Sequence, residues 1–165
     1  MRTIMNILLC LAIAAGMASC GYSGNKSDES DNKLSRSEKK EMKEMMKDLS
    51  DKVEIKGDKV IRTTKGFGGM VTIVTYHFTG DKCTRLVGEN KFPNKKMAEQ
   101  FYNGNKEFGD LFDDIKMEGN TVTYVQSGEL IEHGYSEYTK KSLRDKLQKD
   151  IDDSEKIMEA IKDEL

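Results

Sequence analysis

The pattern of apolar and polar residues after position 35 predicts an antiparallel sheet. Apolar and polar residues alternate on both sides of three two-residue turns, Gly57-Asp58, Gly80-Asp81 and Gly119-Asn120. A turn with Gly in first place is typical of the type II′ hairpin. Three hairpins give about six strands, which we expect at residues 53–56, 59–64, 70–79, 82–91, 112–118 and 121–126.

Three helices are predicted around these hairpins. Ser35 and Glu38 form a capping box, and a stripe of apolar residues at helical spacing follows it. We expect the helices from Ser35 to about Asp51, from Pro93 to about Gly104, and from near Ser136 to the end. The order is then αββββαββα. We interpret it as an α+β domain with helices packed on an antiparallel sheet. The stripe of the first helix, which we interpret as core packing, is Met42, Met45, Met46 and Leu49.

The first nineteen residues have the features of a cleaved signal peptide. Arg2 supplies the positive charge, residues 4–15 form an apolar stretch, and small residues follow at 16–19. The apolar stretch is shorter than the roughly 20 residues that a membrane-spanning helix needs. The sequence therefore predicts export from the cytoplasm.

The segment Met17-Ala18-Ser19-Cys20 resembles the lipobox of bacterial lipoproteins, and the chain resembles small lipoproteins of the Bacteroidetes type. The resemblance implies that Cys20 is lipidated on its thiol and becomes the first residue of the mature chain. Two or three acyl chains would anchor it stably to a membrane. Gly21 resembles the outer-membrane sorting pattern, so the resemblance implies a lipid-anchored protein of the bacterial outer membrane that faces the periplasm or the cell surface. We therefore divide the chain into a signal peptide at 1–19, a lipidated Cys with a disordered tether at 20–35, and a single α+β domain at 36–165.

Two alternatives to a lipoprotein of the outer membrane stay open. Cys20 could follow an ordinary signal cleavage by chance. The last four residues, Lys162-Asp163-Glu164-Leu165, spell a retrieval signal of the endoplasmic reticulum, which with a cleaved signal would describe a luminal protein. Leu165 also continues the apolar stripe of the last helix, and we interpret the match as a coincidence.

Composition and charge argue against a nucleic-acid-binding protein. Hydrophobic residues make up 36% and charged residues 34% of the 165, and the formal net charge is -2. Such a balance lacks the basic field that usually draws in DNA or RNA, so nucleic acid is not an expected partner.

Candidate catalytic and metal-binding residues are few. Cys83 is the one Cys left in the predicted domain, and pairing about Gly80-Asp81 places Phe78 opposite it and His77 opposite Thr84. The imidazole of His77 should then leave the other face of the sheet, and we expect Cys83 to be a buried structural thiol. His133 is the one other imidazole that could reach it. We expect no metal site, no cofactor and no catalytic residue, and we interpret the acidic groups at 110–114 and 150–153 as solvated surface.

These observations favour a membrane-anchored, non-catalytic domain of the cell envelope that binds a protein, peptide or glycan. A hydrolase with an unrecognised carboxylate site and an inhibitor of secreted hydrolases are the alternatives. The last helix is basic at 140–149 and acidic at 150–165, against its own dipole. Pairs within the helix, such as Lys146 with Asp150 and Asp152 with Lys156, should relieve part of this cost. An antiparallel pair of such helices around the apolar stripe would give a weak homodimer.

Overall fold

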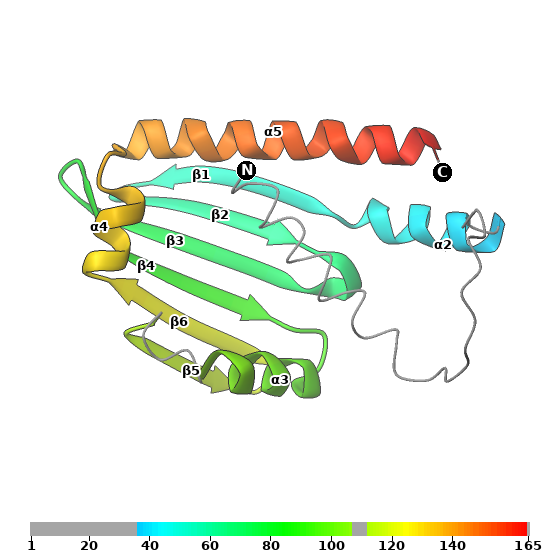
Figure 1. The fold of residues 1–165 in the computed structure, drawn as a ribbon, viewed down its shortest axis with the longest axis horizontal. Helices are drawn as coiled ribbons and strands as arrows, with labels where there is room; N and C mark the ends of the chain where they lie inside the picture. Colours follow the sequence, from blue (N-terminus) through cyan, green and yellow to red (C-terminus); the bar gives the residue numbers. More distant parts are fainter. Residues whose placement is uncertain (1–35, 107–111, 165) are drawn as a thin grey trace, which may run out of the picture. The chain divides into compact units, whose positions relative to one another are not determined.

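A computed structural model describes residues 36–106 and 112–164. The whole sheet lies in one compact unit, whose described residues begin at Lys43. All six strands are antiparallel to their neighbours, which confirms the predicted α+β class and the three hairpins (Figure 1). The strands are β1 (Ser50–Lys56), β2 (Lys59–Lys65), β3 (Val71–Thr79), β4 (Lys82–Lys91), β5 (Asp114–Glu118) and β6 (Thr121–Ser127).

The strand order is β1-β2-β3-β4-β6-β5. The first four strands follow one another along the chain, and the short 3-10 turn η1 (Phe67–Gly69) joins β2 to β3. Helix α3 (Lys95–Lys106) then precedes β5, so that β5 forms the far edge and β6 returns to pair with β4. The two edges of the sheet are therefore β1 and β5.

Glycine makes the hairpin turns possible. Gly57, Gly80 and Gly119 have φ of 61°, 61° and 60°, and no other residue type has a positive φ in the described part of the chain. A positive φ at the first turn position alone distinguishes type II′ from type I′, which needs it at both. The predicted turn type is confirmed at all three hairpins.

The helices differ from the prediction. The described residues form four α-helices, because α4 (Glu129–Tyr135) is separate from α5 (Lys140–Glu164). The side chain of Thr139 accepts a hydrogen bond from the Ser142 amide at 3.2 Å and so caps the start of α5. The break allows Ile131 and Leu143, both 1% exposed, to reach the core from differently directed helices. The predicted count of three helices and a last helix from Ser136 are therefore wrong.

The first helix, α2 (Arg36–Lys47), ends before the predicted Asp51, which belongs to β1. Its capping residue Ser35 lies outside the described residues. Within the apolar stripe, Met46 is buried and Met45 is half exposed. Strand formation wins over helix continuation at Ser50, because the chain pairs there with Lys65 of β2.

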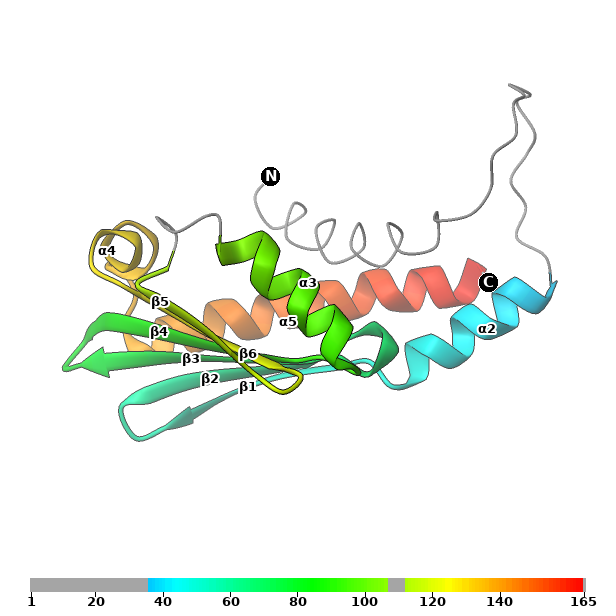
Figure 2. The same cartoon turned by 90° about the horizontal axis from the view of Figure 1, so that it is seen from below.

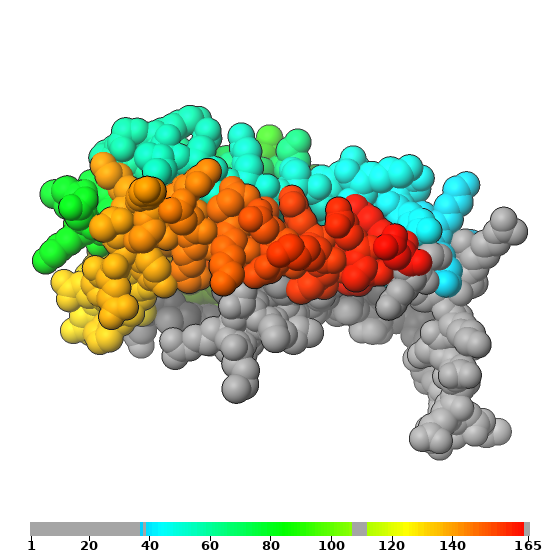
Figure 3. Space-filling view, turned by 90° about the horizontal axis from the view of Figure 1, so that it is seen from above, coloured from blue at the N-terminus to red at the C-terminus, as the bar shows by residue number. Residues whose placement is uncertain are grey.

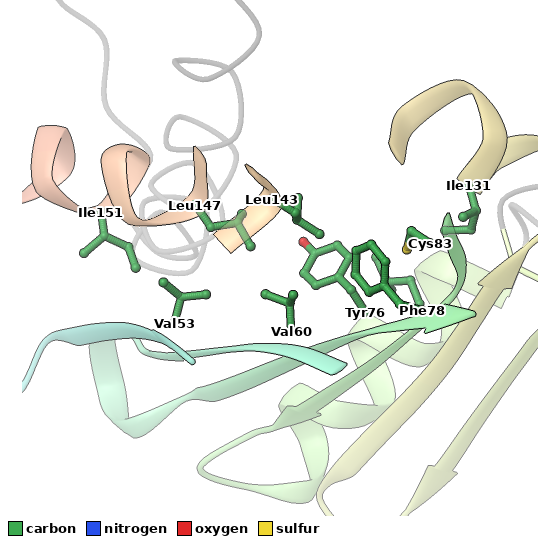
Figure 4. Close-up of a cluster of buried hydrophobic side chains, with 10 residues drawn as sticks. Val53, Val60, Tyr76, Phe78, Cys83, Ile131, Leu143, Leu147 and Ile151 are labelled. Carbon is green, nitrogen blue, oxygen red and sulfur yellow. The ribbon is translucent and has the colours of Figure 1, made fainter. Parts of the chain in front are cut away.

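Helices α3, α4 and α5 pack on one face of the sheet, which we call the inner face (Figure 2). Helix α5 contacts β1 and β2, α4 contacts β4 and β6, and α3 contacts β5 and β6. Figure 4 shows side chains of the strands and of α4 and α5 converging on the main buried cluster. That cluster consists of Val53, Val60, Tyr76, Phe78, Cys83, Leu86, Ile131, Leu143, Leu147 and Ile151.

A second, smaller cluster lies under α3. Ala98 of α3 is fully buried against Val122 of β6 and Phe92, which follows β4. Ile115 and Met117 face Tyr124 and Val122 across the third hairpin, as the alternation of residues predicted. The core is therefore built on the inner face alone.

Candidate functional site

Cys20 lies outside the described residues, as do the whole signal segment and the tether. Its lipidation stays a prediction, and so do the outer-membrane location and the domain boundaries. In the part of the chain that the structure describes, no helix is long and apolar enough to cross a membrane.

Cys83 is a buried free thiol. Phe78 lies opposite Cys83 as predicted, but His77 lies opposite Arg85, not Thr84, because the register shifts between His77 and Phe78. Desolvation by burial raises the pKa of the Cys83 thiol, although a weak hydrogen bond to the Arg85 carbonyl opposes this. A nucleophilic Cys needs the reverse, a lowered pKa beside a cation.

Neither imidazole is placed to activate this thiol. His77 points to the other face of the sheet, between the inward-facing Tyr76 and Phe78. His133 lies in α4, where its Nδ1 is 2.8 Å from the Glu129 carbonyl oxygen. The sequence pattern predicts a loop after the third hairpin at this position, and this prediction is wrong.

The acidic groups are engaged in local contacts. Asp114 pairs with Lys116 at 2.5 Å, and the Ser127 hydroxyl donates to the Asp113 carboxylate at 2.5 Å. Asp110 lies outside the described residues. Within those residues, no group of three or more His, Cys, Asp or Glu could hold a metal ion.

Helix α5 uses much of its apolar stripe for the core. Leu143, Leu147 and Ile151 are buried against the sheet, whereas Ile157 and Ile161 are 52% and 38% exposed. Figure 3 shows α5, in orange to red, lying along one side of the first hairpin. The apolar residues of the basic half of α5 are therefore already packed on the sheet. An antiparallel pair of α5 helices cannot form along the whole apolar stripe. The weak homodimer stays a prediction that only the acidic half could support.

The charges on α5 pair partly as expected. Lys146 pairs with Asp150 at 2.8 Å, as predicted. Lys156 pairs with Asp153 at 3.2 Å, while the Gln148 amide donates to Asp152. The predicted Asp152–Lys156 pair is therefore wrong, because Lys156 pairs with the carboxylate three residues before it and not with the one four residues before it.

A polar cluster interrupts the inner face near the start of β1. The Arg62 Nε donates to both carboxylate oxygens of Asp51 at 3.0 and 3.1 Å, and the Thr64 hydroxyl donates to the same carboxylate at 3.1 Å. Burial lowers the pKa of Arg62, but the hydrogen bond and charge of Asp51 outweigh it and raise the pKa overall. Next to this group, the Thr72 hydroxyl donates to the buried Asn90 at 2.8 Å. These polar groups satisfy one another and stabilise the fold.

The opposite face of the sheet, which we call the open face, carries none of the described helices α3, α4 and α5 (Figure 2). Register decides which residues lie on it, because paired residues of neighbouring strands share a face. Its strand positions hold eight basic and four acidic side chains. The basic ones are Lys52, Lys56, Lys59, Lys65, Lys82, Arg85, Lys91 and Lys116, and the acidic ones are Glu54, Glu89, Asp114 and Glu118.

Four basic-type residues form one row across this face. Lys56 pairs with Lys59, Lys59 with His77, and His77 with Arg85, so the row crosses β1, β2, β3 and β4 at neighbouring positions. We call Lys56, Lys59, His77 and Arg85 the basic row. Strands are about 4.8 Å apart, so the row presents like charges close together.

The charges of neighbouring members of the row act on His77. Partial burial lowers the pKa of His77, and the positive charges of Lys59 and Arg85 lower it further, while Asp58 opposes them. Lys56 pairs with Glu54 at 2.9 Å. Lys59 and Arg85 have no ion-pair partner among residues 36–106 and 112–164.

A band of β-branched side chains lies between this row and the far end of the face. None of its members is fully buried, although a sheet face without helices would usually carry more polar residues. We call these residues the β-branched band; they are Ile61, Thr63, Val71, Ile73, Thr75, Val87, Thr121, Thr123 and Val125.

No local pattern in the sequence predicts the open face as a surface. Alternation within β2 and β3 shows two kinds of position, but both contain Val and Thr, and the two Ile residues lie on the open face, so it cannot tell which set faces the helices. The clearest available signal was Lys56, Lys59 and Arg85, each close to a hairpin turn. Their alignment in one row depends on the bulge at His77, which no local pattern indicates.

The fold and this face define a two-layer α+β protein with one helix-covered face and one open, basic face. A scan against protein-family models, a search of curated proteins and a search of solved structures each returned no match to this chain. The function must therefore be inferred from the geometry of the chain itself.

Proposed function

We propose that this protein is a membrane-anchored, non-catalytic lipoprotein of the bacterial outer membrane that binds a protein, peptide or glycan through the open face. The observation that carries the proposal is the open face itself, whose Lys59 and Arg85 have no ion-pair partner among the described residues and whose Val and Ile side chains are half-buried. A soluble domain usually covers such side chains or replaces them with polar ones, so their presence supports a binding surface.

The tether would hold the domain near its membrane. Residues 20–35 are polar, and a flexible chain of that length reaches roughly 20 Å on average. The endoplasmic-reticulum lumen is the alternative location. Mass spectrometry of the membrane fraction should find Cys20 as a diacylated N-terminal residue; a soluble chain with an unmodified Cys20 thiol would contradict the anchor.

The hydrolase alternative needs a carboxyl group that keeps its proton near neutral pH. Glu54, on the open face, is opposite in character, because its hydrogen bond with Lys56 lowers the pKa of the carboxyl group. The Glu54 carboxylate therefore suits an ion pair and not the role of a proton donor. The inhibitor alternative has no observation of its own in its favour.

Site-specific photo-crosslinking in the native envelope tests the proposed surface. A photoreactive residue replaces Thr75, at the centre of the open face, and in a matched chain replaces the exposed Lys149 of α5. We expect one defined crosslinked partner from position 75 and none of the same mass from position 149. Equal crosslinking from both positions, or none from position 75, would contradict the open face as the binding surface.

A further inference from the structure

We propose that the open face binds an acidic protein, with carboxylates against the basic row and apolar side chains against the β-branched band. This inference rests on the proposed function and narrows its partner to one class. It depends on the charge of the face, on its apolar centre and on the lack of Trp, Tyr and Phe at its strand positions.

Charge selects an acidic partner. The face carries eight basic and four acidic strand residues, although the whole chain has a net charge of -2. Two of the four acids are already paired, Glu54 with Lys56 and Asp114 with Lys116. Lys59 and Arg85 thus stand near the middle strands with no described partner. Complementary charges of this kind steer association and set specificity.

The β-branched band selects a protein among acidic ligands. A protein interface commonly has an apolar centre and a charged rim, and here Ile61, Ile73 and Val87 lie between the basic row and Lys65 and Lys91. An acidic glycan, a nucleic acid or a lipid headgroup would leave these aliphatic side chains without matching contacts. The strand positions of the open face also include no Trp, Tyr or Phe on which sugars or bases could stack.

The size of the face fits a protein partner. Six strands about 4.8 Å apart and four rows of residues about 6.8 Å apart give the face a projected area of roughly 780 Å². A stable interface buries about 800 Å² on each partner, so the face is large enough for one. Electrostatic attraction should account for a large share of the association rate and of its salt dependence.

His77 makes the predicted binding depend on pH. The charged groups around its ring are Lys59, Arg85 and Asp58, and a partner carboxylate would be added to them. That carboxylate favours the protonated imidazole, so binding should strengthen as the pH falls from 7.5 to 5.5. The acidic partner keeps most of its charge over this range, because Asp and Glu titrate near pH 4.

Charge reversal in the full-length, membrane-anchored chain is the test. The variant Lys59→Glu/Arg85→Glu is compared with Lys141→Glu/Lys149→Glu, which makes the same net change on exposed positions of α5. Both carry the photoreactive residue at position 75. We expect roughly a tenfold loss of the crosslinked product for the first variant and little change for the second. Purified chain should also bind poly-L-glutamate, and His77→Gln should weaken the gain in binding at pH 5.5.

The outcomes separate this inference from the proposed function. A crosslinked partner that survives the Lys59→Glu/Arg85→Glu change would overturn the acidic partner and leave the open face as a binding surface. The absence of any crosslink from position 75 in the unaltered chain would contradict both the acidic partner and the open face as a binding surface. Binding to phosphatidylglycerol vesicles or to polygalacturonate, with none to poly-L-glutamate, would replace the protein with a membrane or a glycan and so overturn the inference. Circular dichroism of both variants shows that a loss of binding is not a loss of fold.

Discussion

Gly88 shows how one residue position depends on its neighbour across the sheet. It lies in β4 opposite Tyr124 of β6, and a methyl group on Gly88 would overlap the Tyr124 ring. Phe112 also packs against that ring, with centroids 5.0 Å apart. The ring can therefore lie across the strand only because position 88 has no side chain.

Replacing Gly88 with Ala should destabilise the domain by about 1–3 kcal/mol, the usual cost of overpacking. Gly104→Ala is the control, because Gly104 lies in α3 with open space around it and Ala favours helix. Urea unfolding followed by circular dichroism measures both. Equal midpoints for the two variants would show that Tyr124 moves aside without cost.

Cys83 supports a second prediction at this scale. Its thiol is buried and its pKa is raised, so little thiolate forms at neutral pH. We expect Cys83→Ser to cost about 1 kcal/mol or somewhat more for burying a hydroxyl, and Cys83→Ala to define the packing loss alone. Labelling of folded protein with a thiol reagent at pH 7 should be slow, and rapid labelling would contradict a buried structural thiol.

At the scale of elements, α5 illustrates how tertiary packing divides a helix into two parts. Ile151 is 2% exposed in the main cluster, while Ile157, less than two turns later, is 52% exposed. Both lie in the same continuous helix, so helix propensity is shared and burial is the difference between them.

Ile151→Ala should lower the free energy of unfolding by about 2–4 kcal/mol, because it removes buried methyl groups and leaves a cavity. Ile157→Ala should change it by less than about 0.5 kcal/mol, since the side chain is mostly in solvent. Denaturation by urea compares the two variants with the unaltered chain. A large loss for Ile157→Ala would indicate that a partner or another part of the chain covers it.

The elements also show what periodicity can and cannot predict. Alternation and the turn residues predicted all six strands within a few residues and the correct pairing of Ile115 and Met117. Residues 129–135 gave no separate helical signal, because this helix of about two turns contributes a single buried anchor, Ile131. A helix that short is stabilised by packing and not by its own sequence.

For the whole molecule, the open face couples stability to pH through His77. Burial and the charges of Lys59 and Arg85 lower its folded pKa below the ordinary value. A lowered imidazole pKa means that the unfolded chain binds a proton more readily, so stability is greatest above the unfolded pKa and falls as the pH drops toward the folded pKa.

We expect the urea midpoint to decrease slightly between pH 7.5 and pH 5.5, and His77→Gln to lose part of that decrease. His77 is only partly buried, so solvent screens the charges around it and the change should be small. The measurement is paired urea titrations at the two pH values. A midpoint that rises toward pH 5.5 in the unaltered chain, and does so less in His77→Gln, would mean that the row stabilises the charged imidazole.

The sequence by itself determined the local features of this protein: the Gly-first turns, the alternating strands, the long amphipathic last helix and a prediction of lipid attachment at Cys20. Each depends on a few neighbouring residues, through the φ that Gly allows or the period of apolar positions. Only the tertiary structure decided that β6 lies beside β4, that α4 and α5 are separate, and which face of the sheet remains open. The basic row belongs to this second group, because Lys56, Lys59, His77 and Arg85 come from four strands and meet only through register. Register is set by long-range pairing and by the bulge at His77, neither of which a short stretch of sequence contains.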